Sequence, residues 1–149
     1  MIRRLAPAGV VLAGLLLAGC ANTTGTEVDY PQPAALESIP GSDLHKVVLT
    51  QLAATQLGVQ TVPVAAVAGL PKGAAPETSI PLTALVYGPD GAPWTYQNIA
   101  ALTYQREPLV IDHITSDTVV LRSGPPVGTP VVSVGGQELL GAEYGVGEE

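Results

Sequence analysis

The chain has 149 residues with 17 Gly, 14 Pro, one Cys and no Phe, which is the size of one small domain with many turns. All 13 acidic residues and only four of the six basic residues follow Cys20, so the chain after Cys20 has a net charge of −9. This charge argues against nucleic-acid binding, which needs a basic patch, and against a polybasic contact with anionic lipid. The single Cys excludes an intrachain disulfide, and the lack of internal Met excludes a methionine-rich copper site.

The N-terminal segment has the features of a bacterial lipoprotein signal. Two Arg residues precede an apolar run over 5–19 that is too short to span a bilayer. The run ends in Leu17-Ala18-Gly19-Cys20, which resembles the bacterial lipobox. The resemblance implies cleavage between Gly19 and Cys20 and acylation of the Cys20 sulfur, which with two or three chains gives stable anchoring.

Residues 1–19 are therefore predicted to be a signal peptide, and the protein a lipoprotein anchored on the extracytoplasmic side of a membrane. That membrane would be the plasma membrane of a monoderm, or a membrane facing the periplasm in a diderm. Residues 20–42 lack periodicity and are rich in Asn, Thr, Gly and Pro, so we predict a flexible tether. A folded domain is predicted over 43–145, and a frayed tail over 146–149.

The domain is predicted to start with a strand, a short helix and a second strand. His45–Leu49 reads as a strand, after which Thr50 could cap a helical turn over 51–57 that Gly58 ends. Residues 59–64 return to a strand pattern, in which Pro63 favours an edge position. The apolar residues expected to share one side of the helix are Leu49, Leu52, Ala53 and Leu57.

A β-hairpin is predicted after a linker over 65–78 that is rich in Ala, Gly and Pro. Residues 80–87 alternate as in a strand, and Gly88-Pro89-Asp90-Gly91 has the composition of a turn in which Gly91 takes a positive φ. Trp94 and Tyr96 then lie two apart on one face of the returning strand. We expect the core to be organised around this hairpin.

The rest of the chain predicts further short strands and a closing helix. Residues 99–114 form either one long strand or two bent strands, interrupted near 106–108. The later strands are predicted over 118–122 and 130–134, with turns over 115–117 and 124–128 and a helix over 137–144. Strands at this spacing predict an all-β fold, a small barrel or sandwich with one or two short helical turns.

No residue clearly indicates a reaction. Asp112 and His113 could form a base with its orienting carboxylate, but neighbours on a strand point to opposite faces and are poorly placed to pair. The nearby serines are Ser116, Ser123 and Ser133, and none lies in a Gly-x-Ser-x-Gly nucleophile elbow. We therefore predict no catalytic residue.

Metal, phosphate and carbohydrate sites receive no stronger support. His45 and His113 lack the spacing of metal ligands. The glycines near 124 and 135–136 lack the Lys and the context of a phosphate loop. Trp94, Tyr96 and Tyr104 could form a stacking platform, but aromatics on a hairpin are more often core residues or cross-strand pairs. No cofactor and no metal are predicted.

Two segments resemble the periplasmic adaptor proteins, also called membrane-fusion or HlyD-like proteins, of efflux pumps. The first is 46–64, with its Leu-Gly-Val step and its Pro-Val end. The second is 80–144, with Ile-Pro-Leu-Thr-Ala-Leu-Val-Tyr at its start, Trp-Thr-Tyr at 94–96 and Gly-Gly-Gln-Glu-Leu-Leu-Gly-Ala-Glu at 135–143. Together they cover most of the chain after the tether.

The resemblance implies a reduced adaptor. A full adaptor carries a lipoyl-like domain, a helical hairpin and a barrel between these segments, whereas this chain has only the linker 65–78. What remains corresponds to the membrane-proximal domain, which in the family packs on an inner-membrane transporter. The hairpin residues Tyr87, Asp90 and Trp94 are the predicted partner contacts.

Three functions follow from the sequence, in order of preference. The first is a non-catalytic lipoprotein that assists an inner-membrane transporter of resistance-nodulation-division or ABC type, with self-association left open. The second is a ligand-binding or envelope-structural lipoprotein that kept the adaptor fold without a pump. The third is an enzyme, which would need His45 or His113 within hydrogen-bond reach of a Ser or a carboxylate in a cleft.

Overall fold

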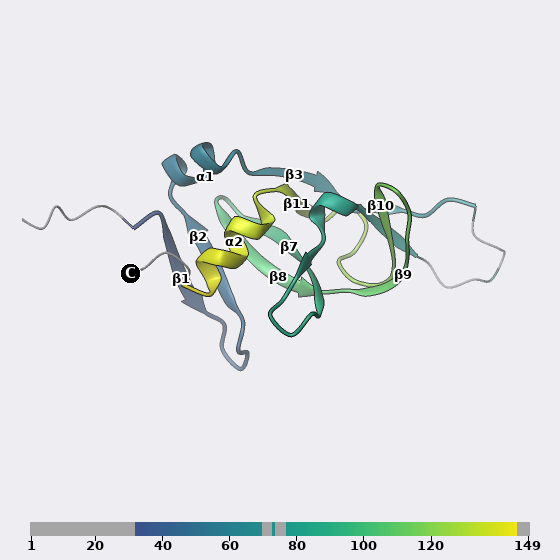
Figure 1. Cartoon of the computed structure of the whole chain (residues 1–149), viewed down its shortest axis with the longest axis horizontal. Helices are drawn as coiled ribbons and strands as arrows, with labels where there is room; N and C mark the ends of the chain where they lie inside the picture. The colour runs from purple at the N-terminus through teal and green to yellow at the C-terminus, as the bar shows by residue number, and fades with distance from the viewer. Residues whose placement is uncertain (1–31, 70–72, 74–76, 146–149) are drawn as a thin grey trace, which may run out of the picture. The chain divides into compact units, whose positions relative to one another are not determined.

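The computed structural model of the chain describes residues 32–69, 73 and 77–145. Within these ranges the backbone is mostly strand, with two short α-helices and one 3₁₀ turn (Figure 1). The elements in chain order are β1 (Ala34–Ser38), β2 (His45–Leu49), α1 (Gln51–Leu57), β3 (Gln60–Pro63), β4 (Ala65–Ala66), β5 (Thr78–Pro81), η1 (Leu82–Ala84), β6 (Val86–Tyr87), β7 (Pro93–Ala100), β8 (Thr103–Pro108), β9 (Val110–Ile114), β10 (Thr118–Ser123), β11 (Pro130–Val134) and α2 (Gly136–Glu143).

The strands form two antiparallel sheets. The larger sheet has the order β1-β2-β8-β7-β11-β3, with β6 paired to the start of β7. The smaller sheet has the order β4-β5-β10-β9. Neither path closes on itself, so the all-β prediction is confirmed in its open, sandwich-like form and not as a closed barrel.

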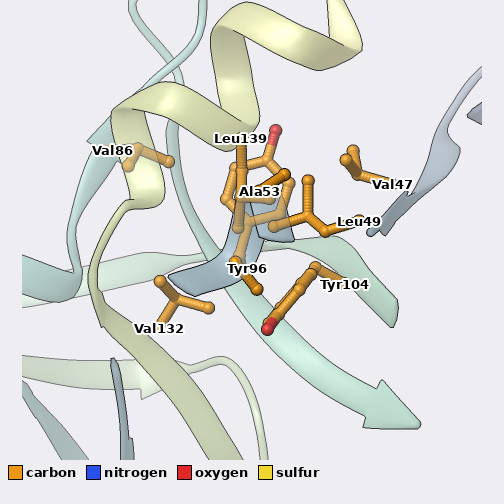
Figure 2. Packing of buried hydrophobic residues seen from close by; sticks show 9 residues of the cluster. Val47, Leu49, Ala53, Val86, Tyr96, Tyr104, Val132 and Leu139 are labelled. Carbon is orange, nitrogen blue, oxygen red and sulfur yellow. The ribbon is translucent and has the colours of Figure 1, made fainter. Parts of the chain in front are cut away.

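The first hydrophobic cluster lies between the larger sheet and the two helices. Helix α2 contacts β2, β6 and β7, and so covers one face of this sheet. Figure 2 shows side chains from strands and helices converging there, with Leu139 of α2 and Ala53 of α1 among strand residues. The buried members are Val47, Leu49, Ala53, Ala54, Val86, Tyr96, Tyr104, Val132 and Leu139.

The second cluster joins the smaller sheet to β11 and to the segment around η1. Its buried members are Val64, Ile80, Ala84, Leu85, Leu109, Val119, Leu121 and Val131. Val131 and Val132 are neighbours on β11 and therefore point to opposite faces, which places one in each cluster. Strand β11 thus has a hydrophobic core on both of its faces.

The first helix begins and ends at the residues predicted from the local sequence. Thr50 accepts a hydrogen bond from the Ala53 N–H at 3.1 Å, and Gly58 ends α1 with φ of 62°. Strand β2 has the predicted bounds, and Pro63 lies on β3 at the edge of the larger sheet. The predicted apolar side is confirmed at Leu49 and Ala53 but wrong at Leu52 and Leu57, which are 66% and 36% exposed, because α1 turns Ala53 and Ala54 to the core.

The predicted hairpin turn is also confirmed. The Gly91 N–H donates to the Gly88 carbonyl at 2.9 Å, and Gly91 has φ of 78°. The Asp90 carboxylate accepts from the Ala92 N–H at 3.1 Å, which fixes the exit of the turn. A Cβ on Gly88 would lie 2.8 Å from Asp90 Oδ1 and 3.1 Å from Trp94 Nε1, so the turn packs closely on the indole.

The strand predicted over 80–87 is broken in the structure. Strand β5 pairs with β10 in the smaller sheet, whereas β6 pairs with β7 in the larger one. The 3₁₀ turn η1 between them changes the direction of the chain from one sheet to the other. Only β6 and β7 therefore form the predicted hairpin. The alternating pattern of 80–87 comes from residues that are buried in two different sheets.

Two segments predicted to lack structure contain strands. The tether prediction over 20–42 is wrong for Ala34–Ser38, which forms β1 and pairs along its whole length with β2. The linker prediction over 65–78 is wrong at its ends, because Ala65–Ala66 forms β4 against β5. These Ala-rich sequences do not predict strands by themselves, and they become ordered by pairing with neighbouring strands. The predicted tail over 146–149 lies outside the described residues.

The remaining elements agree with the sequence closely. Of the two alternatives for 99–114, the structure has two strands, β8 and β9, separated at Leu109, while 99–100 belongs to β7. Strands β10 and β11 and helix α2 fall within a residue or two of their predicted bounds. A tight turn before Thr103 was not predicted, and in it Leu102 has φ of 55° and its carbonyl accepts from the Leu49 N–H.

The N-cap assigned to α1 can be tested directly by substitution. Thr50→Ala removes the side-chain acceptor for the Ala53 N–H and should lower the free energy of unfolding by about 1 kcal/mol. Thr55→Ala is the matched control, because Thr55 is exposed on the same helix and its hydroxyl bonds only to Gln51, one turn earlier; a change below about 0.5 kcal/mol is expected. Urea unfolding measures both, and equal losses would contradict the assigned cap.

Candidate functional site

A buried polar network fastens α2 to the larger sheet. The Tyr96 hydroxyl donates to Glu143 Oε2 at 2.6 Å, and Arg106 Nε lies 2.8 Å from the same oxygen. The side chains of Arg106 and Glu143 are only 7% and 2% exposed. The Arg106 N–H is not aligned with Glu143 Oε2, so this contact is a charge pair more than a directed hydrogen bond. A buried carboxylate thus meets one cation and one hydroxyl at the C-terminal end of α2.

Two aromatic rings enclose the Arg106 guanidinium. Its central carbon lies 4.6 Å from the centre of the Trp94 ring and 5.2 Å from that of Tyr144, distances that allow cation–π attraction. Burial lowers the pKa of Arg106, but its contact with the Glu143 carboxylate more than reverses this and leaves the pKa raised. Burial, together with the hydrogen bond to Glu143, raises the pKa of Tyr96. Both groups therefore keep their protons at neutral pH.

Next to this network, a largely apolar groove opens between β1, α1 and α2. Its volume is about 370 Å³, which lies within the usual range of ligand pockets. The lining residues are Pro33, Ala34, Leu49, Ala53, Gln56, Leu57, Glu138, Gly141 and Ala142. Small side chains on all three elements leave this space, because Ala34, Ala53 and Ala142 carry only a methyl group where a larger residue would fill it.

The groove has one charge and an apolar rim. Glu138, exposed in the first turn of α2, is the only charged residue that lines it. Leu57 is 36% exposed, and Leu36, which lies on the same face of β1 as Ala34, is 45% exposed. The groove therefore suits an apolar group accompanied by a cation.

The predicted contact residues on the hairpin differ in their accessibility. Tyr87 is 51% exposed at the end of β6, and Asp90 is exposed while its carboxylate holds the turn. Trp94 is half-buried against Arg106, and its Nε1 is buried without a hydrogen-bond partner among the described residues. Tyr87 and Asp90 are thus free to meet a partner, whereas Trp94 mainly packs inside.

The prediction that Asp112 and His113 do not pair is wrong. His113 Nδ1 lies 2.8 Å from Asp112 Oδ2, and Arg122 Nε donates to Asp112 Oδ1 at 2.6 Å. The two neighbours meet because both side chains are at the exposed edge strand β9, where each can turn along the surface. His113 and Arg122 hold the pKa of Asp112 below its usual range.

This surface cluster does not acquire the partners of a hydrolytic site. Ser133 bonds to the Gln60 carbonyl, and no Ser hydroxyl bonds to His113 in the part of the chain that the structure describes. The His45 backbone N–H, not its ring, faces Glu143 Oε1 at 3.5 Å. No group of three or more potential metal ligands occurs among the described side chains.

The aromatic residues considered as a stacking platform are core residues. Tyr96 and Tyr104 are 1% and 5% exposed and belong to the first hydrophobic cluster. Gly19 and Cys20, the predicted cleavage and lipidation site, lie outside the described residues. In the ranges that are described, no helix has the length and hydropathy needed to cross a membrane.

Sequence reasoning missed both the Glu143 network and the groove. A signal for the first was present, because Glu143 follows Leu139 by four residues and so shares the buried face of α2. An acidic residue at such a position needs a buried partner, and Arg106 was one of few cations available. The groove had no comparable signal, since its walls come from three separate elements.

The Glu143 network predicts a large difference between two acidic residues of α2. Glu143→Ala leaves the Arg106 charge buried without its counter-ion and should lower the free energy of unfolding by about 3–5 kcal/mol. Glu138→Ala removes an exposed carboxylate of the same helix and should change it by less than about 0.5 kcal/mol. Urea midpoints measure both; similar values would show that Glu143 does not fasten α2.

The raised pKa of Tyr96 predicts a loss of stability at alkaline pH. An unfolded Tyr ionises near pH 10.0, while folded Tyr96 stays protonated, so above that pH the unfolded state binds fewer protons and is favoured. Unfolding free energies from pH 8 to 11 should fall as pH rises above about 10. Tyr96→Phe should show a shallower fall than Tyr87→Phe, which changes an exposed ring; identical slopes would refute this cause.

Comparison with known proteins found no relative of this chain. No protein-family model, no curated protein and no solved structure was found to match the chain. The similarity to the periplasmic adaptor proteins therefore stays a prediction from the sequence.

Proposed function

We propose that the protein is a non-catalytic, membrane-anchored lipoprotein whose β domain acts as an adaptor-like accessory module for an inner-membrane transporter of the efflux type. The observation that carries this proposal is the position of the apolar groove. Pro33 lines it, so the chain that leads from Cys20 reaches the domain at the rim of the groove. This position supports a binding surface on the side of the domain from which the segment toward the predicted anchor leaves.

The length of the connecting segment supports contact with a membrane partner. Residues 21–32 separate Cys20 from Pro33, and 12 extended residues span at most about 40 Å. An acyl group on Cys20 would hold the groove within this distance of the membrane. Such tethering raises the effective concentration of the domain for a partner in the same membrane, so a modest groove suffices for binding.

The groove also supports a second candidate function. Its volume of about 370 Å³ and its apolar lining suit a small hydrophobic ligand. A ligand-binding or envelope-structural lipoprotein would use the same anchor and fold without a transporter. The two candidates differ in what occupies the site in cells, a segment of a permease or a small molecule.

Crosslinking in cells tests the transporter proposal. A photoreactive residue at Tyr87, Asp90 or Gln56 should form adducts with a transporter permease in the membrane fraction, because these positions are exposed on the hairpin and at the groove. Val127, 57% exposed on a different loop, is the control position and should form few. Mass spectrometry of the adducts identifies the partner.

The anchor is tested in the same cells. Cys20→Ser should abolish acylation with radiolabelled palmitate. Adducts only with the protein itself, with cell-wall polymer or with extracted small molecules would refute the transporter proposal in favour of the second candidate. Palmitate labelling of Cys20→Ser equal to that of the unchanged protein would refute the lipid anchor.

A further inference from the structure

Strand β1 is an unprotected edge of the larger sheet. Among the residues that the structure describes, β1 lies at one end of the strand order of this sheet and pairs only with β2. Exposed edges invite pairing with other chains, and proteins usually block them with Pro, Lys, bulges or very short strands. Within Ala34–Ser38 there is no Pro, Lys or register shift, and the one charged residue, Glu37, lies on the face opposite to that of Ala34 and Leu36.

The other four edge strands in the described ranges carry such protection. Strand β3 ends in Pro63, and its pairing with β11 contains a register shift. Strands β4 and β6 have only two residues each. Strand β9 is distorted by two register shifts against β10. Strand β1 is therefore the exception, which suggests that its edge is kept free for pairing.

The hydrogen-bonding groups on the free side of β1 can be identified. The Thr50 N–H donates to the Pro33 carbonyl, which makes these two residues a hydrogen-bonded pair. Such pairs alternate along an antiparallel ladder, so Ala35 and Glu37 turn their backbone groups toward β2. The N–H and C=O groups of Ala34, Leu36 and Ser38 consequently point away from the sheet.

The bonds of β2 to its other neighbour confirm this assignment. The Leu49 N–H donates to the Leu102 carbonyl in the turn before β8. Leu49 therefore directs its backbone groups toward β8, as its partner Ala34 must direct its own away from β2. The outer edge of β1 thus offers three residues for main-chain bonding.

The apolar groove adjoins this edge on the helix-covered face. Ala34 and Leu36 pair with Leu49 and Val47, whose side chains lie in the first hydrophobic cluster, so all four point to that face. A strand added to β1 would lie about 4.8 Å away. Every second side chain of the added strand would then face the groove beside Ala34, Leu57 and Ala142.

We infer that β1 and the adjoining groove bind an extended segment of a partner protein by strand addition. The segment carries apolar side chains at alternate positions, which enter the groove, and a Lys or Arg that meets Glu138. Main-chain bonds to β1 provide affinity, and the groove selects the side chains. The inference deepens the proposed function and rests on it for the location of the partner in the membrane.

Charge decides between a partner protein and a second copy of this chain. Two copies paired through β1 would bring together two chains that each carry a net charge of −9 after Cys20, and like charges oppose association. Neither β1 nor the groove lining contributes a cation to meet the Glu138 of another copy. A basic, apolar segment of a different protein satisfies both the groove and the charge.

The binding experiment uses the full mature chain from residue 20, with Cys20→Ser so that no detergent competes for the groove. The probe is a nine-residue synthetic peptide in which Val and Lys alternate, and its control has the same composition with the Val residues in one block. Fluorescence anisotropy at about 0.15 M salt, where long-range charge effects are screened, measures both. The alternating probe should bind at least about fivefold more tightly.

Substitutions on each part of the site should weaken this binding. Leu36→Pro removes an outward N–H that β2 does not use, which an edge strand tolerates, and should weaken binding about fivefold or more, the equivalent of one lost hydrogen bond. Leu36→Thr keeps the N–H and should weaken it less. Ala142→Leu fills the groove without touching β1 and should also weaken it severalfold. Unchanged urea midpoints confirm that each variant is folded.

Hydrogen exchange gives a readout that needs no variant at the edge. Saturating probe should slow exchange of the Leu36 amide, measured by NMR, while the Ala35 amide, already bonded to β2, should change little. Equal binding of the block control, no slowing at Leu36, or a dimer in sedimentation that the probe dissociates would each overturn the inference. These measurements need neither anchor nor transporter, so their outcome is independent of the crosslinking test.

Discussion

The buried carboxylate of Glu143 is the constraint on which the arrangement of the larger sheet and its helix depends. It lies in a nearly solvent-free position and is balanced by one cation, Arg106, and one hydroxyl, Tyr96. A buried charge without such partners is strongly unfavourable, so α2 can lie in this place only if β7 and β8 present these two side chains. The network therefore fixes the position of α2 along the sheet, which hydrophobic contacts of Leu139 alone would allow to slide.

The position of α2 in turn creates the surface that we assign to binding. With α2 held over β2 and β7, its small residues Gly141 and Ala142 face α1 and β1 across an open space. Larger residues there would have closed the core, as they do around Tyr96. Because the outer backbone groups of β1 have no partner within the described ranges, the groove and the edge form one continuous surface at the place where the N-terminal segment joins the domain.

The proposed role combines this surface with the expected lipid anchor. An anchored domain needs little intrinsic affinity for a partner in the same membrane, because tethering restricts the volume that it explores. Strand addition suits such a role, since main-chain bonds accept many sequences while a single groove imposes a modest preference. The acidic surface then opposes association between copies and favours a basic segment of another protein.

The sequence by itself determined the local elements of this protein. Thr50 and Gly58 delimit α1, the Gly88–Gly91 turn creates the β6–β7 hairpin, and the apolar pattern of β2 and β11 marks buried strands, because each depends on residues close together in the chain. Only the tertiary structure decided that β5 leaves the larger sheet, that Ala34–Ser38 becomes a strand, and that Glu143 meets Tyr96 across 47 residues. The groove was also decided only by the tertiary structure, since its walls come from three elements. Periodicity indicates which face of a segment is buried, but it does not identify the distant segment that covers this face. The covering segment is decided by packing and charge pairing across the whole domain.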